Sequence, residues 1–198
     1  MELNILSLTY LFLRLAPFIL VSFFSLASVF NQDFKGFIYL IGLIFACFST
    51  VLLGNMIPIP FMPVPNEICN MVTFGQSNSF SKLPLSQCIF GYTAAYLFYV
   101  IFKYQYVLQN IPTLLFFPMI IMFDMAWNLK NSCYNIIQLA MSVGFGIGFG
   151  YLWAYVIDRT KMTQLQYFNQ ISGKPECSRP AKNTFRCRVY KNGQLLNT

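Results

Sequence analysis

Apolar residues run along most of this chain in long stretches, and polar residues gather in short segments between them. Each stretch is long enough, at about 1.5 Å per residue, to cross the roughly 30 Å hydrocarbon core of a bilayer as a helix. Five such runs are present, over residues 10–30, 36–57, 85–102, 112–127 and 133–157. The pattern therefore predicts five transmembrane helices.

The connection after the second run breaks the helical pattern. Pro58, Pro60, Pro63 and Pro65 prevent a helix from continuing, and residues 66–85 mix polar with apolar positions. We expect an irregular loop there.

The first run differs from the others because Arg14 and Pro17 interrupt it. If it lay only at the membrane interface, four spans would remain and the N-terminus would change sides. It lacks the basic start and small-residue cleavage site of a signal peptide, so we expect it to stay as an anchor.

Composition supports a membrane protein and narrows its chemistry. Hydrophobic residues make up 57% of the 198 residues and charged residues only 10%, against roughly 25% charged in a globular domain. Histidine is absent, which excludes an imidazole base or metal ligand. Six cysteines are too few for a disulfide scaffold. We predict an all-α integral membrane helix bundle and expect neither a cofactor nor a metal.

Charge divides the chain into two regions. Basic and acidic residues balance over 1–158, so the net charge of +7 comes from residues 159–198. We therefore expect a transmembrane body at 1–158 and a basic polar tail at 159–198. By the positive-inside rule, the tail should be cytoplasmic or face a virion interior, with Lys35 and Lys103 on its side of the membrane.

Two charged residues fall within the predicted spans. Arg14 lies near the outer end of the first run and Asp124 near the outer end of the fourth, at similar depths. An unpaired charge in hydrocarbon costs at least about 2.5 kcal/mol, so we expect the two to be partners. A structural ion pair, snorkelling by Arg14, and a substrate or ion site all fit this placement.

Glycines in the fifth run predict close helix packing. Gly144 with Gly148 and Gly146 with Gly150 form two overlapping G-x-x-x-G pairs. Such pairs let another helix approach because no side chain intervenes. The partner helix can belong to this chain or to a second copy. A phosphate-binding loop would also need a strand and a polar partner, which are missing.

Four-residue steps in the third and fifth runs suggest a family. Pro-Leu-Ser-Gln at 84–87 opens the third run, and Gln138, Ser142, Gly146 and Gly150 follow one another at intervals of four. This spacing resembles the membrane-embedded type 2 phosphatidic acid phosphatases, whose motifs contain Pro-Ser-Gly-His and a His followed by Asp four residues on. The resemblance implies a site on the outer side of the membrane.

The catalytic groups of that family are missing from this chain. Gln87 and Gln138 occupy the positions of the two histidines, and no Lys-x6-Arg-Pro motif precedes Pro84. Neither a phosphohistidine nucleophile nor its general acid can form. The resemblance therefore implies a degenerate polar cleft around Gln87, Gln138 and Ser142, and we expect no enzyme activity.

The tail pattern predicts a small hairpin that docks on a partner. Residues 184–190 alternate, and Asn192-Gly193 favours a type I′ turn before residues 194–196. An isolated hairpin is marginal in water, so we expect it to dock on a protein partner or on the membrane face. The docking residues are expected to be Arg179, Lys182, Arg186, Arg188, Tyr190 and Lys191. Anionic lipid explains these charges more simply than nucleic acid does, because stacking aromatics are few.

Cys177 and Cys187 of the tail leave several states open. The two can form a disulfide, share a metal or remain free thiols. Two cysteines without histidine are a weak zinc signal.

The tail also resembles the C-terminal tails of uncharacterised multipass membrane proteins from large DNA viruses. The similar segments are Cys-Ser-Arg-Pro at 177–180 and Arg-Cys-Arg-Val-Tyr-Lys-Asn-Gly at 186–193. The resemblance implies a virion inner-membrane protein whose tail contacts an internal or capsid layer.

Two functions fit these patterns. The first is a non-enzymatic membrane scaffold, as a homo- or hetero-oligomer in the bilayer. The second is a lipid-handling or small-solute transport protein with a cleft around Gln87, Gln138 and Asp124. A scaffold should fill this volume with side chains, whereas a transporter should leave a cavity.

Overall fold

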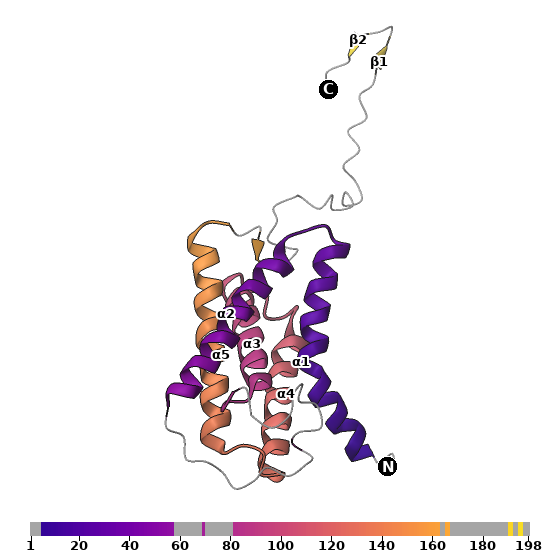
Figure 1. Cartoon of the computed structure of the whole chain (residues 1–198). Coiled ribbons are helices and arrows are strands. Elements are labelled where there is room, and N and C mark those ends of the chain that lie inside the picture. The colour runs from indigo at the N-terminus through magenta and orange to yellow at the C-terminus, as the bar shows by residue number, and fades with distance from the viewer. Residues whose placement is uncertain are drawn as a thin grey trace.

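The computed structural model of the chain describes residues 5–57, 69, 81–162 and 165–166, together with the backbone of two short strands in the tail. The described body is made of helices (Figure 1). They are α1 (Ile5–Phe30), α2 (Lys35–Met56), α3 (Leu85–Lys103), α4 (Ile111–Lys130) and α5 (Ile136–Arg159).

All five helices are long and apolar enough to cross a membrane. The prediction of an all-helical body with five candidate spans is therefore confirmed. The helix ends differ from the predicted runs because backbone hydrogen bonding continues into polar residues. Thus α4 extends to Lys130 and α5 to Arg159, beyond the residues where the hydropathy falls.

Three of the helices end in the same kind of tight turn. Gln32, Gln105 and Ser132 take a positive φ of 52°, 59° and 54°, two residues after their helix ends. In each turn the next N–H bonds back to a carbonyl five residues earlier, for example from Cys133 to Asn128 at 2.9 Å. This is the Schellman arrangement, which satisfies the last carbonyls of a helix and reverses the chain sharply.

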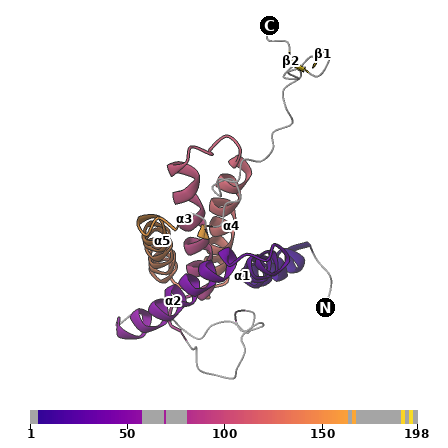
Figure 2. The same ribbon diagram turned by 90° about the horizontal axis from the view of Figure 1, so that it is seen from above.

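Helix α3 is the centre of the bundle. It packs most extensively on α5 and also contacts α1, α2 and α4. Viewed from above, α5 and α1 lie on opposite sides of α3 (Figure 2). Consistent with this position, α3 has a larger buried share than any other candidate span.

Hydrogen-bonded aromatic side chains fill the interior. Tyr39, Tyr92 and Tyr96 are fully buried, and their ring centroids lie 5.4–6.2 Å apart. The Tyr39 hydroxyl lies 2.6 Å from Thr93 Oγ1, and the Tyr92 hydroxyl donates to the Tyr39 carbonyl at 3.1 Å. These bonds satisfy polar groups that would be costly to leave unpaired in a dry core.

The outer faces of the helices keep large apolar side chains exposed. Ile44 is 67% and Met122 69% exposed. A water-soluble domain rarely presents such extensive apolar surface. Lipid contact explains these faces.

The tail contains strands β1 (Tyr190–Lys191) and β2 (Gln194–Leu195). They pair antiparallel, with Tyr190 opposite Leu195. The rest of the predicted hairpin lies outside the described residues, as do the proposed docking residues Arg179, Lys182, Arg186 and Arg188 and both tail cysteines.

Candidate functional site

The intramembrane carboxylate of Asp124 is held by the first turn of α3. Asp124 is 1% exposed, and its Oδ2 accepts a hydrogen bond of 2.6 Å from Gln87 Nε2. Ser86 Oγ donates to the same oxygen at 3.3 Å. Because both donors lie at the N-terminus of α3, the positive end of that helix also favours the negative charge.

Arg14 contributes charge to this cluster. It attracts Asp124 electrostatically, while Gln87 and Ser86 donate hydrogen bonds to the carboxylate. The positive charge of Arg14 also interacts electrostatically with Tyr134, in the turn between α4 and α5. The charge of Arg14 is thus one part of a larger polar cluster around Asp124.

Asp124 lies well inside α4 rather than at its end. Helix α4 continues six residues beyond it, which is about 9 Å by helix rise. At this depth, the protein has to supply the polar contacts that water would supply at the surface.

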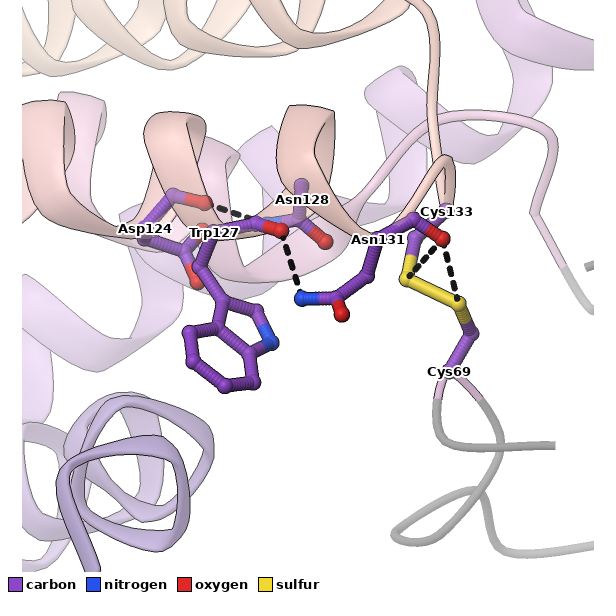
Figure 3. Close-up of a disulfide and its surroundings, with 6 residues drawn as sticks. All are labelled: Cys69, Asp124, Trp127, Asn128, Asn131 and Cys133. Atoms are coloured by element: carbon purple, nitrogen blue, oxygen red, sulfur yellow. Dashed lines mark hydrogen bonds between the residues drawn. A yellow bond between two sulfur atoms is a disulfide. The ribbon is translucent and has the colours of Figure 1, made fainter. Parts of the chain in front are cut away.

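Asparagine side chains continue the polar cluster along α4. Asn128 Nδ2 donates to the Asp124 carbonyl at 2.7 Å, and Asn131 Nδ2 donates to the Trp127 carbonyl at 2.9 Å (Figure 3). Each amide bonds to the carbonyl one turn earlier, so the pair supports the last two turns of α4. The series leads from Asp124 towards the end of the bundle.

A disulfide joins two connections at this end of the bundle. Cys69, from the segment between α2 and α3, is bonded to Cys133, just after α4, with their Cα atoms 5.6 Å apart. Both sulfurs lie 3.9 Å from the Asn131 carbonyl oxygen, a packing contact because a disulfide has no proton to donate (Figure 3). The sequence analysis predicted no bridge between these cysteines, although the alternation of five spans puts both connections on the same side of a membrane.

Two amide oxygens in the cluster have no hydrogen-bond partner within the part of the chain that the structure describes. These are Gln87 Oε1 and Asn128 Oδ1, on side chains that are fully buried. Exchanging O and N in either amide would break a bond that its nitrogen now makes. The cluster therefore keeps unused acceptor capacity beside Asp124.

Gln138 and Ser142, which were predicted to line a cleft with Gln87, hold the start of α3 instead. Gln138 caps α5 by accepting from Asn135 N at 2.9 Å, and it donates to the Lys82 carbonyl at 3.0 Å. Ser142 Oγ donates to the Pro84 carbonyl at 2.6 Å. Gln87 faces α4, so the three side chains divide between two interfaces.

An open groove of about 700 Å³ lies elsewhere along α3 and α5. Its lining is mostly apolar and aromatic, with Lys103 at one end, and it contains none of the predicted cleft residues. The residues lining it are Ala95, Phe98, Tyr99, Phe102, Lys103, Ile147, Gly148 and Tyr151.

The two glycine pairs of α5 have different surroundings. A Cβ on Gly146 would collide with the Cys88 carbonyl of α3, and one on Gly150 with the Tyr92 carbonyl. A Cβ on Gly144 or Gly148 would have no neighbour within 4 Å. One pair thus allows the close contact between α3 and α5, and the other borders open space, where Gly148 lines the groove.

The opposite end of α3 and α5 carries a second polar cluster. Lys103 forms an ion pair with Asp158, and Tyr99 and Tyr104 donate to the same carboxylate at 3.2 and 3.4 Å. Beyond α5, the buried Gln166 donates to the Ala154 carbonyl at 3.3 Å. These contacts fasten the end of α5 from which the tail leaves.

The described residues offer few side chains that could bind a metal ion or take part in a reaction. They contain no group of three or more His, Cys, Asp or Glu side chains that could hold a metal ion. The cluster at Asp124 offers one carboxylate, two amides and a hydroxyl, with Arg14 nearby. Such a set can bind polar groups and hold helices together.

Comparison with known proteins adds no relative: no protein-family model, curated protein or solved structure matches this chain.

Proposed function

We propose that this chain is a non-enzymatic multipass membrane scaffold whose basic tail docks on a partner layer. One observation carries the proposal: the polar residues expected to line an outer cleft bind neighbouring helices. Gln87 binds Asp124 of α4, and Gln138 and Ser142 bind carbonyls at the start of α3. An active cleft would need such groups directed at a substrate.

The filled interior supports the same function. Buried Tyr39, Tyr92 and Tyr96 occupy the centre of the bundle with their ring edges and faces in contact. A scaffold benefits from such packing because it presents its tail from a fixed position. A transport protein, by contrast, must open a path through its interior.

The tail supplies the docking function in this proposal. Residues 159–198 carry the positive excess, and we propose that the hairpin around Asn192-Gly193 contacts an acidic protein surface. The resemblance to viral tails makes a virion inner membrane the setting that we propose. The partner would then be an internal or capsid layer.

The unpartnered amide oxygens favour one alternative. Gln87 Oε1 and Asn128 Oδ1 next to Asp124 leave a polar spot within the membrane, as a small-solute transport protein would. This spot is fully buried, so the alternative also requires an opening motion.

A cross-linking experiment tests docking by the tail. A photoreactive residue replaces Tyr190 in the full chain, in membranes that contain the partner layer. A second variant carries it at Leu108, which is 85% exposed in the α3–α4 connection at the same end of the bundle. We expect a discrete protein adduct from position 190 only, weakened by Arg186→Ala with Arg188→Ala. Lipid adducts alone from both positions would contradict docking on a protein.

A further inference from the structure

The disulfide carries information about the two sides of the membrane. Cys69 and Cys133 lie in the α2–α3 and α4–α5 connections, which alternation of five spans places on one side. The α1–α2 turn, the α3–α4 connection and the end of α5 lie on the other side. A bond between the two loops is therefore consistent with the order of the helices.

Disulfides persist in oxidising compartments and are rare where glutathione and thioredoxin keep thiols reduced. We propose that the end of the bundle with the Cys69–Cys133 disulfide faces an oxidising compartment. The opposite end, with the basic tail, then faces a reducing one. This inference uses the five spans of the proposed function but not its scaffold role.

Charge supports the same orientation independently of sulfur chemistry. Lys82 and Lys130 are the described basic residues next to the disulfide loops. The other end has more: Lys35, Lys103, Arg159 and Lys161, in addition to the bases of the tail. Cytoplasmic loops carry an excess of Lys and Arg, so both signals place the tail in the cytoplasm or an equivalent reducing space.

The orientation predicts the redox state of the four cysteines that lie outside the helices. The Cys69 and Cys133 thiols lose two protons and two electrons as the S–S bond forms, and the electrons pass to a protein disulfide of the oxidising compartment. Cys177 and Cys187 of the tail stay reduced, which excludes a disulfide from their open states.

The remaining two cysteines lie inside the bundle. Cys47 and Cys88 are free and lie next to each other, and Cys88 Sγ is 3.1 Å from Thr50 Oγ1. Cys88 is fully buried. A large thiol reagent should therefore not reach this pair while the helices remain packed.

Thiol labelling of the full chain tests this partition. Sealed vesicles with their cytoplasmic face outward are treated with a polyethylene-glycol maleimide that cannot cross the membrane, with and without a charged phosphine reductant. We expect labels on Cys177 and Cys187 only, unchanged by the reductant and absent after Cys177→Ser with Cys187→Ser. Permeabilised vesicles with reductant should gain two further labels, which Cys69→Ser with Cys133→Ser removes.

Other labelling patterns would overturn the inference. Labels at Cys69 and Cys133 from the cytoplasmic face, or tail cysteines that react only after reduction, would place the disulfide and the tail differently. Free Cys69 and Cys133 thiols without reductant would show that the bridge does not form. None of these outcomes bears on catalysis, so they leave the scaffold role to its own test.

Discussion

At the scale of single residues, buried polar side chains connect neighbouring helices through hydrogen bonds. The bond from Gln87 to Asp124 is the shortest within its cluster and joins α3 to α4. Hydrogen bonds to charged groups contribute about 1.5–3 kcal/mol each. Their removal should weaken the bundle without changing its surface.

Replacing Gln87 tests this statement. We expect Gln87→Leu to lower the free energy of unfolding by about 1.5–3 kcal/mol, because Asp124 loses its closest donor. Ser86→Ala is the matched control, since it removes a longer bond of 3.3 Å to the same oxygen. Chemical denaturation in mild detergent measures both. Equal losses, or none for Gln87→Leu, would contradict the role assigned to this bond.

Arg14 and Asp124 give a second prediction at this scale. Arg14→Ala and Asp124→Ala should each destabilise the bundle, by up to about 3–5 kcal/mol, because each leaves an uncompensated buried charge. The double variant should recover part of the loss. Strictly additive losses, measured by thermal unfolding in detergent, would mean that the two charges do not interact.

At the scale of elements, α5 is asymmetric. A Cβ added at Gly146 or Gly150 would collide with the backbone of α3, whereas one at Gly144 or Gly148 would meet nothing within 4 Å. The pairs share residue type, spacing and helix, so each is a control for the other.

Gly150→Ala should therefore be destabilising and Gly148→Ala tolerated. A methyl group at Gly150 would press on the Tyr92 carbonyl, and overpacking of this kind costs typically about 1–3 kcal/mol. At Gly148 the better helix propensity of alanine should stabilise by up to about 1 kcal/mol. The melting temperatures of the two variants test this prediction. A larger loss for Gly148→Ala would indicate that this face binds something in the purified protein.

The sequence predicted the helices themselves but few of the contacts between them. Spans follow from uninterrupted apolar length, which depends on composition alone. Which glycine pair faces α3 depends on the rotation of α5, which its glycine spacing leaves open. The Gln87–Asp124 contact likewise needs two helices in register. The family resemblance predicted a shared cleft for Gln87 and Gln138, whereas their hydrogen bonds reach Asp124 of α4 and the Lys82 carbonyl before α3, respectively.

At the scale of the whole molecule, the two ends of the helical body differ. One end carries the disulfide, and the other end carries more basic residues. The Cys69–Cys133 bridge closes a loop with a sequence separation of 64. Sequence analysis could have found it by pairing the cysteines of connections on one side. Six cysteines are too few for a disulfide scaffold but enough for a single bridge.

Loss of the bridge should destabilise the bundle measurably. For a loop of this length, the chain-entropy model gives about 4 kcal/mol from restriction of the unfolded chain. Cys133→Ser should therefore lower the melting temperature of the purified protein to that of the reduced wild type. A reductant should then have no further effect on the variant. An unchanged melting temperature would mean that the bridge adds little to stability.

The central claim is that the polar groups at the outer end hold helices together and perform no catalysis. The most direct measurement is release of phosphate from phosphatidic acid and related lipid phosphates by the purified full chain in detergent, with Asp124→Asn alongside. We predict no release above a protein-free blank for either protein, because Gln87 and Gln138 neither attack phosphate nor exchange protons near neutral pH. Turnover by the wild type that disappears with Asp124→Asn would contradict the account.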